Sequence, residues 1–165
     1  MKILVLSDSH SSLRFMRECI RIIKPDCVMH LGDYSEDGRV IAVENPQISF
    51  FQVFGNCDGL FGTSPGESTL VCEVCGVRLL LTHGHRFQVK TGLDKLLSYA
   101  RDCGVSGVLF GHTHKALCRY EQDGLLILNP GAAGFCGGSA GIIEISDNRI
   151  TACQIIGQAE LDARC

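Results

Sequence analysis

The stretch Lys2-Ile3-Leu4-Val5-Leu6-Ser7-Asp8-Ser9-His10 joins an apolar run directly to polar residues. Its aliphatic part is short and includes the β-branched Ile3 and Val5, which is typical of a buried strand. Asp8 and His10 can bind a cation or move a proton, and they follow the strand at once. The stretch therefore predicts a buried strand with reactive side chains at its carboxyl end.

Strands and helices alternate through the first half of the chain. Apolar residues recur at helical spacing over 13–23, and Pro25 ends that helix. Strands are expected over 26–31 and 48–54, on either side of a polar segment that can hold a short helix. This β-α-β-α-β order predicts an α/β fold with parallel strands joined by right-handed crossovers.

The second half is richer in strands. A hairpin is expected over 67–74 and 77–82, followed by a helix over about 92–103 that starts with a capping box of Thr91 and Asp94. A strand over 105–110 follows, and then three or four more strands run from 116 to about 156. The two halves could contribute two sheets stacked face to face, within one domain over 1–165.

Composition limits the classes of function. The chain has 165 residues, 45% of them hydrophobic and 20% charged, which is enough to bury one sizeable core. A net charge of −3 leaves no broad basic face, so long nucleic acid is not expected as a partner. A small anionic substrate remains possible if bound cations supply positive charge.

Location follows from the apolar runs and the cysteines. The longest apolar run near the N-terminus, Ile3–Leu6, is too short for a signal-peptide core or a membrane span. We therefore expect a cytoplasmic protein without membrane contact, whose ten cysteines are reduced thiols. The pair Cys72 and Cys75 lacks a partner pair at zinc-site spacing, so we expect packing roles for both.

Polar side chains follow each predicted strand of the αβ pattern. They lie one to three residues beyond the strand ends and comprise Asp8, Asp33, Asn56, His83 and His112. Ligands bind outside the carboxyl ends of strands in open α/β sheets. A single parallel register would therefore bring all five to one rim.

Two pairs at spacing i,i+2 add to this set, Asp8 with His10 and His112 with His114. In an extended segment such pairs project to the same side and can offer two ligands. The inventory is carboxylate, imidazole and one amide, which suits divalent Mn, Fe, Ni, Co or Zn. His30, inside the second strand, is expected to be a hydrogen-bonded core histidine.

These motifs resemble those of the calcineurin-like metallophosphoesterases, in order and in spacing. The chain is also similar in length to the small bacterial and archaeal phosphodiesterase branch. The resemblance implies two stacked mixed β-sheets flanked by helices, a four-layer α-β-β-α sandwich. The motifs are DSH at 8–10, GD at 32–33, GNCD at 55–58, HGH at 83–85, GHTH at 111–114 and NPG at 129–131.

The resemblance also implies a role for each matching residue. Two divalent cations, manganese foremost, would generate a hydroxide for in-line attack on a small phosphodiester. Asp33, Asn56 and His83 would count as catalytic as well as metal-binding. Asp8, His10 and His114 would hold the first metal, Asn56, His83 and His112 the second, and Asp33 would bridge the two.

Three neighbouring residues are expected to line the site. Cys57 stands where phosphomonoesterases of the family carry a histidine that acts as general acid, and our hypothesis is that it transfers no proton. Asp58 is expected to orient its neighbours. His85 could contact the substrate phosphate or be exposed and solvated. Backbone amides of the glycine-rich loop 131–141 could cradle phosphate, although an ordinary turn is favoured there.

Two other functions stay open on the same fold. One is a non-catalytic scaffold or binding protein, as the retromer's small subunit is, and the other is a phosphomonoesterase. The complete ligand set disfavours the scaffold, and Cys57 disfavours the phosphomonoesterase. A homo-oligomer is possible by resemblance.

Overall fold

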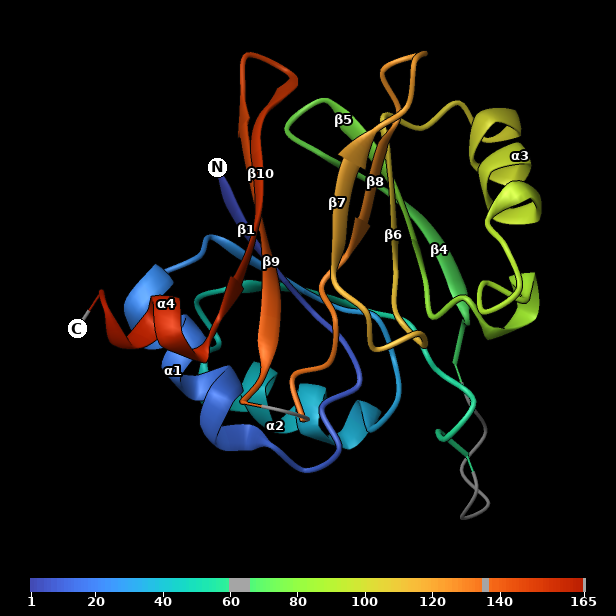
Figure 1. The fold of residues 1–165 in the computed structure, drawn as a ribbon. Coiled ribbons are helices and arrows are strands. Elements are labelled where there is room, and N and C mark those ends of the chain that lie inside the picture. Colours follow the sequence, from blue (N-terminus) through green and yellow to red (C-terminus); the bar gives the residue numbers. More distant parts are fainter. Residues whose placement is uncertain (60–65, 135–136, 165) are drawn as a thin grey trace.

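Two five-stranded mixed sheets lie face to face (Figure 1). The computed structural model describes residues 1–59, 66–134 and 137–164. In spatial order the first sheet consists of β10 (Arg149–Gly157), β9 (Ser139–Ser146), β1 (Lys2–Leu6), β2 (Cys27–His30) and β3 (Ser49–Gln52). The second consists of β4 (Thr69–Val74), β5 (Val77–Thr82), β6 (Gly107–Phe110), β8 (Leu126–Asn129) and β7 (Leu117–Tyr120).

Helices cover the outer faces of both sheets. The first sheet packs against α1 (Leu13–Ile23), α2 (Ser35–Glu44) and α4 (Gln158–Asp162), and the second against α3 (Asp94–Asp102). A short 3₁₀ helix, η1 (His85–Phe87), follows β5. The predicted α-β-β-α layers are confirmed. Among the described residues, no helix is long and apolar enough to cross a bilayer.

The central strand β1 is buried on both faces. Ile3 and Val5 point between the sheets, where they join Leu79 and Leu81 of β5 in one apolar cluster. Leu4 and Leu6 point outward into the cluster beneath α1. This double burial explains why the strand is continuously apolar, because neither face meets water. Each such side chain contributes about 1.5–3 kcal/mol through burial.

Parallel strands end at the same edge of the sandwich in both sheets. β1, β2 and β3 run parallel in the first sheet, and β5, β6 and β8 run parallel in the second. The expectation of a single parallel register was therefore wrong. The candidate ligands come from two sheets, and their convergence depends on how the sheets stack.

Two local predictions also fail. The predicted capping box is absent, since α3 begins at Asp94 after Leu93, and the Thr91 hydroxyl donates to the Gln88 carbonyl at 2.9 Å.

The eight cysteines that the structure describes are free thiols. Cys72 packs in the core as expected, whereas Cys75 is exposed at the hairpin turn, with its Sγ 3.2 Å from Met1 Sδ.

His30 is fully buried at the end of β2, as expected for a core histidine. It lies beneath α2, where a Cβ added at Gly38 would sit 3.3 Å from the His30 ring. The expected hydrogen bond is missing, because neither ring nitrogen has a partner among the described residues. Burial lowers the pKa of this imidazole to about 4.

We predict that His30 makes the protein less stable in acid. Its folded pKa is below the ordinary value of 6.5, so the unfolded chain binds the proton first. The associated stability is present above pH 6.5 and is lost as pH falls toward about 4. Between pH 6.5 and about pH 5, the free energy of unfolding should therefore fall by about 2 kcal/mol less in His30→Leu than in the unmodified protein. Urea unfolding in chelator at several pH values measures this, and parallel pH curves for the two proteins would refute it.

Candidate metal centre

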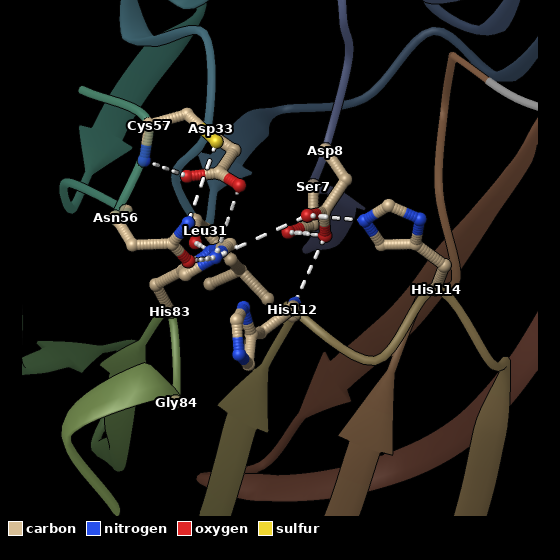
Figure 2. Close-up of polar contacts among 12 residues, drawn as sticks. Ser7, Asp8, Leu31, Asp33, Asn56, Cys57, His83, Gly84, His112 and His114 are labelled. Carbon is tan, nitrogen blue, oxygen red and sulfur yellow. Dashed lines mark hydrogen bonds and ion pairs between the residues drawn. The ribbon is translucent and has the colours of Figure 1, made fainter. Parts of the chain in front are cut away.

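The seven candidate ligands follow β1, β2, β3, β5 and β6, and Figure 2 shows six of them, all but His10, side by side at one edge. Six of them form two sets of three, within each of which the ligand atoms lie within 4.8 Å of one another. Asn56 joins the second set, with its Oδ1 3.2 Å from His83 Nε2. The two sets are Asp8, His10 and His114, and Asp33, His83 and His112.

Sharp backbone turns aim these side chains. Five of the seven have a positive φ, which is uncommon for any residue other than glycine. Such conformations cost free energy and cluster at functional sites. Here they let the chain turn immediately after a strand and still direct a side chain to the shared edge. The five residues are Asp8, His10, Asp33, His112 and His114.

Asp8 connects the two sheets. Its carboxylate is fully buried, and Oδ2 accepts hydrogen bonds from the Ser7 hydroxyl at 2.6 Å and the His112 backbone amide at 3.0 Å. Oδ1 lies 3.0 Å from Nε2 of His114. The approach is so close that a Cβ at Gly111 would lie 2.8 Å from Asp8 Oδ2. Only glycine fits at that position.

His83 shows that the second set suits a cation. Its Nδ1 lies 2.9 Å from the Leu31 carbonyl, which can only accept, so Nδ1 carries the proton. In the neutral ring Nε2 is then an acceptor, yet it faces the acceptor Oδ1 of Asn56 at 3.2 Å and Oδ2 of Asp33 at 3.3 Å. A positive centre among these atoms would satisfy all of them at once.

Charge in this cluster shifts two pKa values in opposite directions. Burial is the largest influence on His83 and would lower its pKa, but Asp33 and Asp8 raise it above the ordinary value. Burial would raise the pKa of Asp33, but contact with His83 and the Cys57 amide holds it well below the usual range. A proton on His83 thus supplies the positive charge beside Asp8 and Asp33 that a divalent cation would also supply.

Asp58 holds together the two loops that carry Asp33 and Asn56. Its Oδ2 accepts from the amides of Asp33 at 3.0 Å and Gly55 at 2.7 Å, and Oδ1 accepts from the amide of Ser35 at 2.7 Å. It therefore positions its neighbours through three backbone amides.

His112 and His85 flank His83. Burial, followed by the charges of His83 and Lys90, lowers the pKa of His112 to about 4, which keeps its imidazole neutral. The His85 ring centroid lies 5.5 Å from that of His83 and 6.2 Å from that of His112. His85 Nδ1 is buried, without a hydrogen-bond partner in the described part of the chain. His85 therefore lies beside the centre with a half-buried side chain, and its contact with a substrate phosphate stays a prediction.

Cys57 lies beside the centre. Its backbone amide donates to Asp33 Oδ1 at 2.8 Å, and its Sγ accepts from the Asn56 side-chain amide at 3.4 Å. Burial and the charge of Asp33 raise the pKa of the thiol to about 11. Its sulfur is in neither ligand set.

Two positioning residues were given no role from the sequence, although Asn129 belongs to the NPG motif at 129–131. Asn129 donates through Nδ2 to the Gly111 carbonyl and the Thr113 hydroxyl, both at 3.0 Å, and so fixes the loop of His112 and His114. Asp37 accepts at Oδ2 from the Ser9 hydroxyl at 2.7 Å. Asn129 follows the same strand-end rule as the ligands and could have been found. Asp37 lies within a helix, where no pattern marks it.

The first part of the glycine-rich loop packs against β1. The amides of Ala133 and Gly134 donate to the carbonyls of Ser7 and Asp8, at 2.9 and 3.1 Å. These two amides are therefore committed within the protein and do not form a phosphate cradle. Residues 135–136 of this loop lie outside the described residues.

A model of the calcineurin-like phosphoesterase superfamily domain matches residues 1–148. The chain belongs to this superfamily. It is similar to a probable metallophosphoesterase of Mycoplasma pneumoniae, 30% identical over 79% of this chain and 78% of that protein. It is also similar to a phosphodiesterase of Methanocaldococcus jannaschii, 28% identical over 86% of this chain and 89% of that protein.

Solved structures share the fold. A predicted phosphoesterase of Streptococcus pneumoniae has a TM-score of 0.74 at 25% identity, covering 96% of this phosphoesterase-family chain and 90% of that one. Vps29 of Entamoeba histolytica complexed with Zn²⁺ has a TM-score of 0.67 at 22% identity, covering 96% and 99%. The second likeness shows the fold alone. The family and the two ligand sets together indicate a phosphoester hydrolase that binds divalent metal.

We predict that Asp58→Ala weakens metal binding by about 10–100-fold, because residues that hold ligands in place have effects of this size. Calorimetric titration of the stripped protein with Mn²⁺ measures the affinity. Asp102→Ala removes an exposed carboxylate from the end of α3 and serves as the matched control. Equal affinities in the two variants would show that the Asp58 bonds do not position the ligands.

Proposed function

We propose that this phosphoesterase is a phosphodiesterase that hydrolyses small phosphodiesters with two divalent cations. Manganese is the first candidate, with nickel, iron, cobalt and zinc as alternatives. One observation carries the proposal: two three-residue ligand sets lie next to each other, with His83 Nε2 3.3 Å from Asp33 and 4.0 Å from Asp8. Adjacent sets of carboxylates and neutral imidazoles are what a two-metal phosphoesterase requires.

The residues divide between the two cations by set. Asp8, His10 and His114 would hold one, and His83, His112 and Asn56 the other. Asp33 would serve both, because its carboxylate lies at the junction and is only 3% exposed. When bound, such a pair lowers the pKa of water and offsets negative charge on a phosphoryl group.

The chain itself supplies fixed positions. The Leu31 carbonyl keeps Nδ1 of His83 protonated and leaves Nε2 as the ligand atom. Asp8 is held by two donors, and Asp33 is held by the Cys57 amide. Groups held in this way would need little reorganisation as charge develops on the phosphoryl oxygens, which is how preorganised sites stabilise a transition state.

The preference for a diester is inferred from the lack of a strong proton donor at Cys57. Phosphomonoesterases of this family resemble the chain but carry a histidine there. A thiol whose pKa is raised to about 11 is a poor donor to a phenolate leaving group. We infer that Cys57 lines the site without transferring a proton, and that diesters with acidic leaving groups react best.

The scaffolding alternative draws support only from the shared fold of the Vps29 structures. The complete ligand set speaks against it. A scaffold has no chemical need for five strained backbone positions that all serve one polar edge.

The direct test measures hydrolysis of bis(para-nitrophenyl) phosphate and para-nitrophenyl phosphate after metal stripping and Mn²⁺, Ni²⁺ or Zn²⁺ addition. We expect metal to restore turnover of the diester in preference to the monoester. Asp33→Asn should abolish restored turnover, because the amide no longer offers a shared anionic ligand. Full activity in this variant would exclude the shared role of Asp33.

We predict that Cys57→Ala lowers diester turnover by less than about tenfold, since a working general acid contributes about 10²–10⁴-fold. Steady-state kinetics with Mn²⁺ bound measures this. The unchanged Mn²⁺ content of the variant is the control. A loss of about a thousandfold at full metal content would assign proton transfer to Cys57.

A further inference from the structure

A cavity of about 590 Å³ adjoins the loop that carries His112 and His114. Its lining comes from the segment after η1, the residues just before α3, and β6 with the segment that leads from it into β7. Its volume is typical of pockets that bind small molecules. The lining residues are Val89, Lys90, Leu93, Phe110, Thr113, Lys115, Ala116 and Leu117.

The cavity and the metal centre share structural elements. Thr113 lines the cavity and lies between His112 and His114 in the chain, and Asn129 fixes its hydroxyl at 3.0 Å. Lys115, which also lines the cavity, directly follows His114 in the chain. A molecule held by the two ligand sets would therefore have the cavity beside it.

The cavity walls are apolar. Phe110 and Val89 are buried, and Leu93 and Leu117 are half-buried members of the cluster beneath α3. Leu93 and Leu117 expose carbon to the cavity, so a planar ring or a compact hydrocarbon group would gain from entering it.

The charged side chains that line the cavity are both positive. Lys90 and Lys115 are exposed, and no carboxylate is among the lining residues of the described chain. Neither ammonium forms an ion pair within residues 1–59, 66–134 and 137–164. Arg101, by contrast, is paired with Asp123 at 2.7 Å. The cavity thus combines apolar walls with two unneutralised cations in a protein of net charge −3.

We propose that this cavity binds one ester group of the phosphodiester, namely an apolar ring that carries a second negative charge such as a carboxylate or phosphate. The inference rests on the proposed phosphodiesterase function and names the substrate class of the same centre. The reacting phosphoryl group would lie at the metal ligands, the ring against Leu93 and Leu117, and the second anion by Lys90 and Lys115.

The test compares two diesters that differ by one carboxylate, para-nitrophenyl phenyl phosphate and its para-carboxyphenyl counterpart, with Mn²⁺ added. We expect the protein to prefer the carboxylated ester in kcat/KM. Lys90→Gln or Lys115→Gln should each reduce this preference by about two- to fivefold, and the double variant by about tenfold, as for partly exposed ion pairs. Lys95→Gln is the matched control, because Lys95 lies on α3 outside the cavity lining and its ammonium bonds Gln88. It should leave the preference unchanged.

A binding measurement separates failure of this inference from failure of the proposed function. Calorimetry with para-carboxyphenylphosphonate and phenylphosphonate, in the presence of Mn²⁺, requires no turnover. If no diester is hydrolysed but the carboxylated phosphonate binds more tightly and depends on the two lysines, the cavity assignment stands and the phosphodiesterase proposal fails. If diesters are hydrolysed but Lys90 and Lys115 variants match Lys95→Gln in both assays, the cavity assignment is overturned. Equal binding of the two phosphonates to the unmodified protein would overturn it as well.

Discussion

Two hydrogen bonds cross from one sheet to the other at the edge where the candidate ligands lie. The carboxylate of Asp8, after β1, accepts from the backbone amide of His112, after β6. The imidazole of His83, after β5, donates to the carbonyl of Leu31, after β2. Both bonds are largely shielded from water, where an unpaired partner would cost about 1–3 kcal/mol. Stacking of the sheets and geometry of the centre therefore depend on each other.

This arrangement carries a cost in the metal-free protein. Two almost fully buried carboxylates each lie within 4.0 Å of the buried His83 Nε2, and five ligand residues adopt strained backbone conformations. A proton on His83 offsets part of the repulsion between Asp8 and Asp33. Bound cations would offset it more completely and stabilise the folded state by mass action. The repulsion between these buried carboxylates is thus the reason that this edge should bind metal.

Much of this could be predicted from local sequence. Continuous apolar runs give buried strands, as over Lys2–Leu6, and polar residues placed just after them identify the ligands. Periodicity cannot tell which strands pair, so the division of the ligands between two sheets was missed. Thr91 bonds the Gln88 carbonyl in a competing turn, and Asp37 bonds a serine 28 residues away. Contacts of this kind depend on tertiary packing.

Anomalous X-ray scattering from crystals soaked in Mn²⁺ tests the central claim most directly. The account predicts two peaks, one among Asp8, His10 and His114 and the other among Asp33, His83, His112 and Asn56. Absence of scattering at this edge, or a peak only elsewhere on the surface, would contradict it.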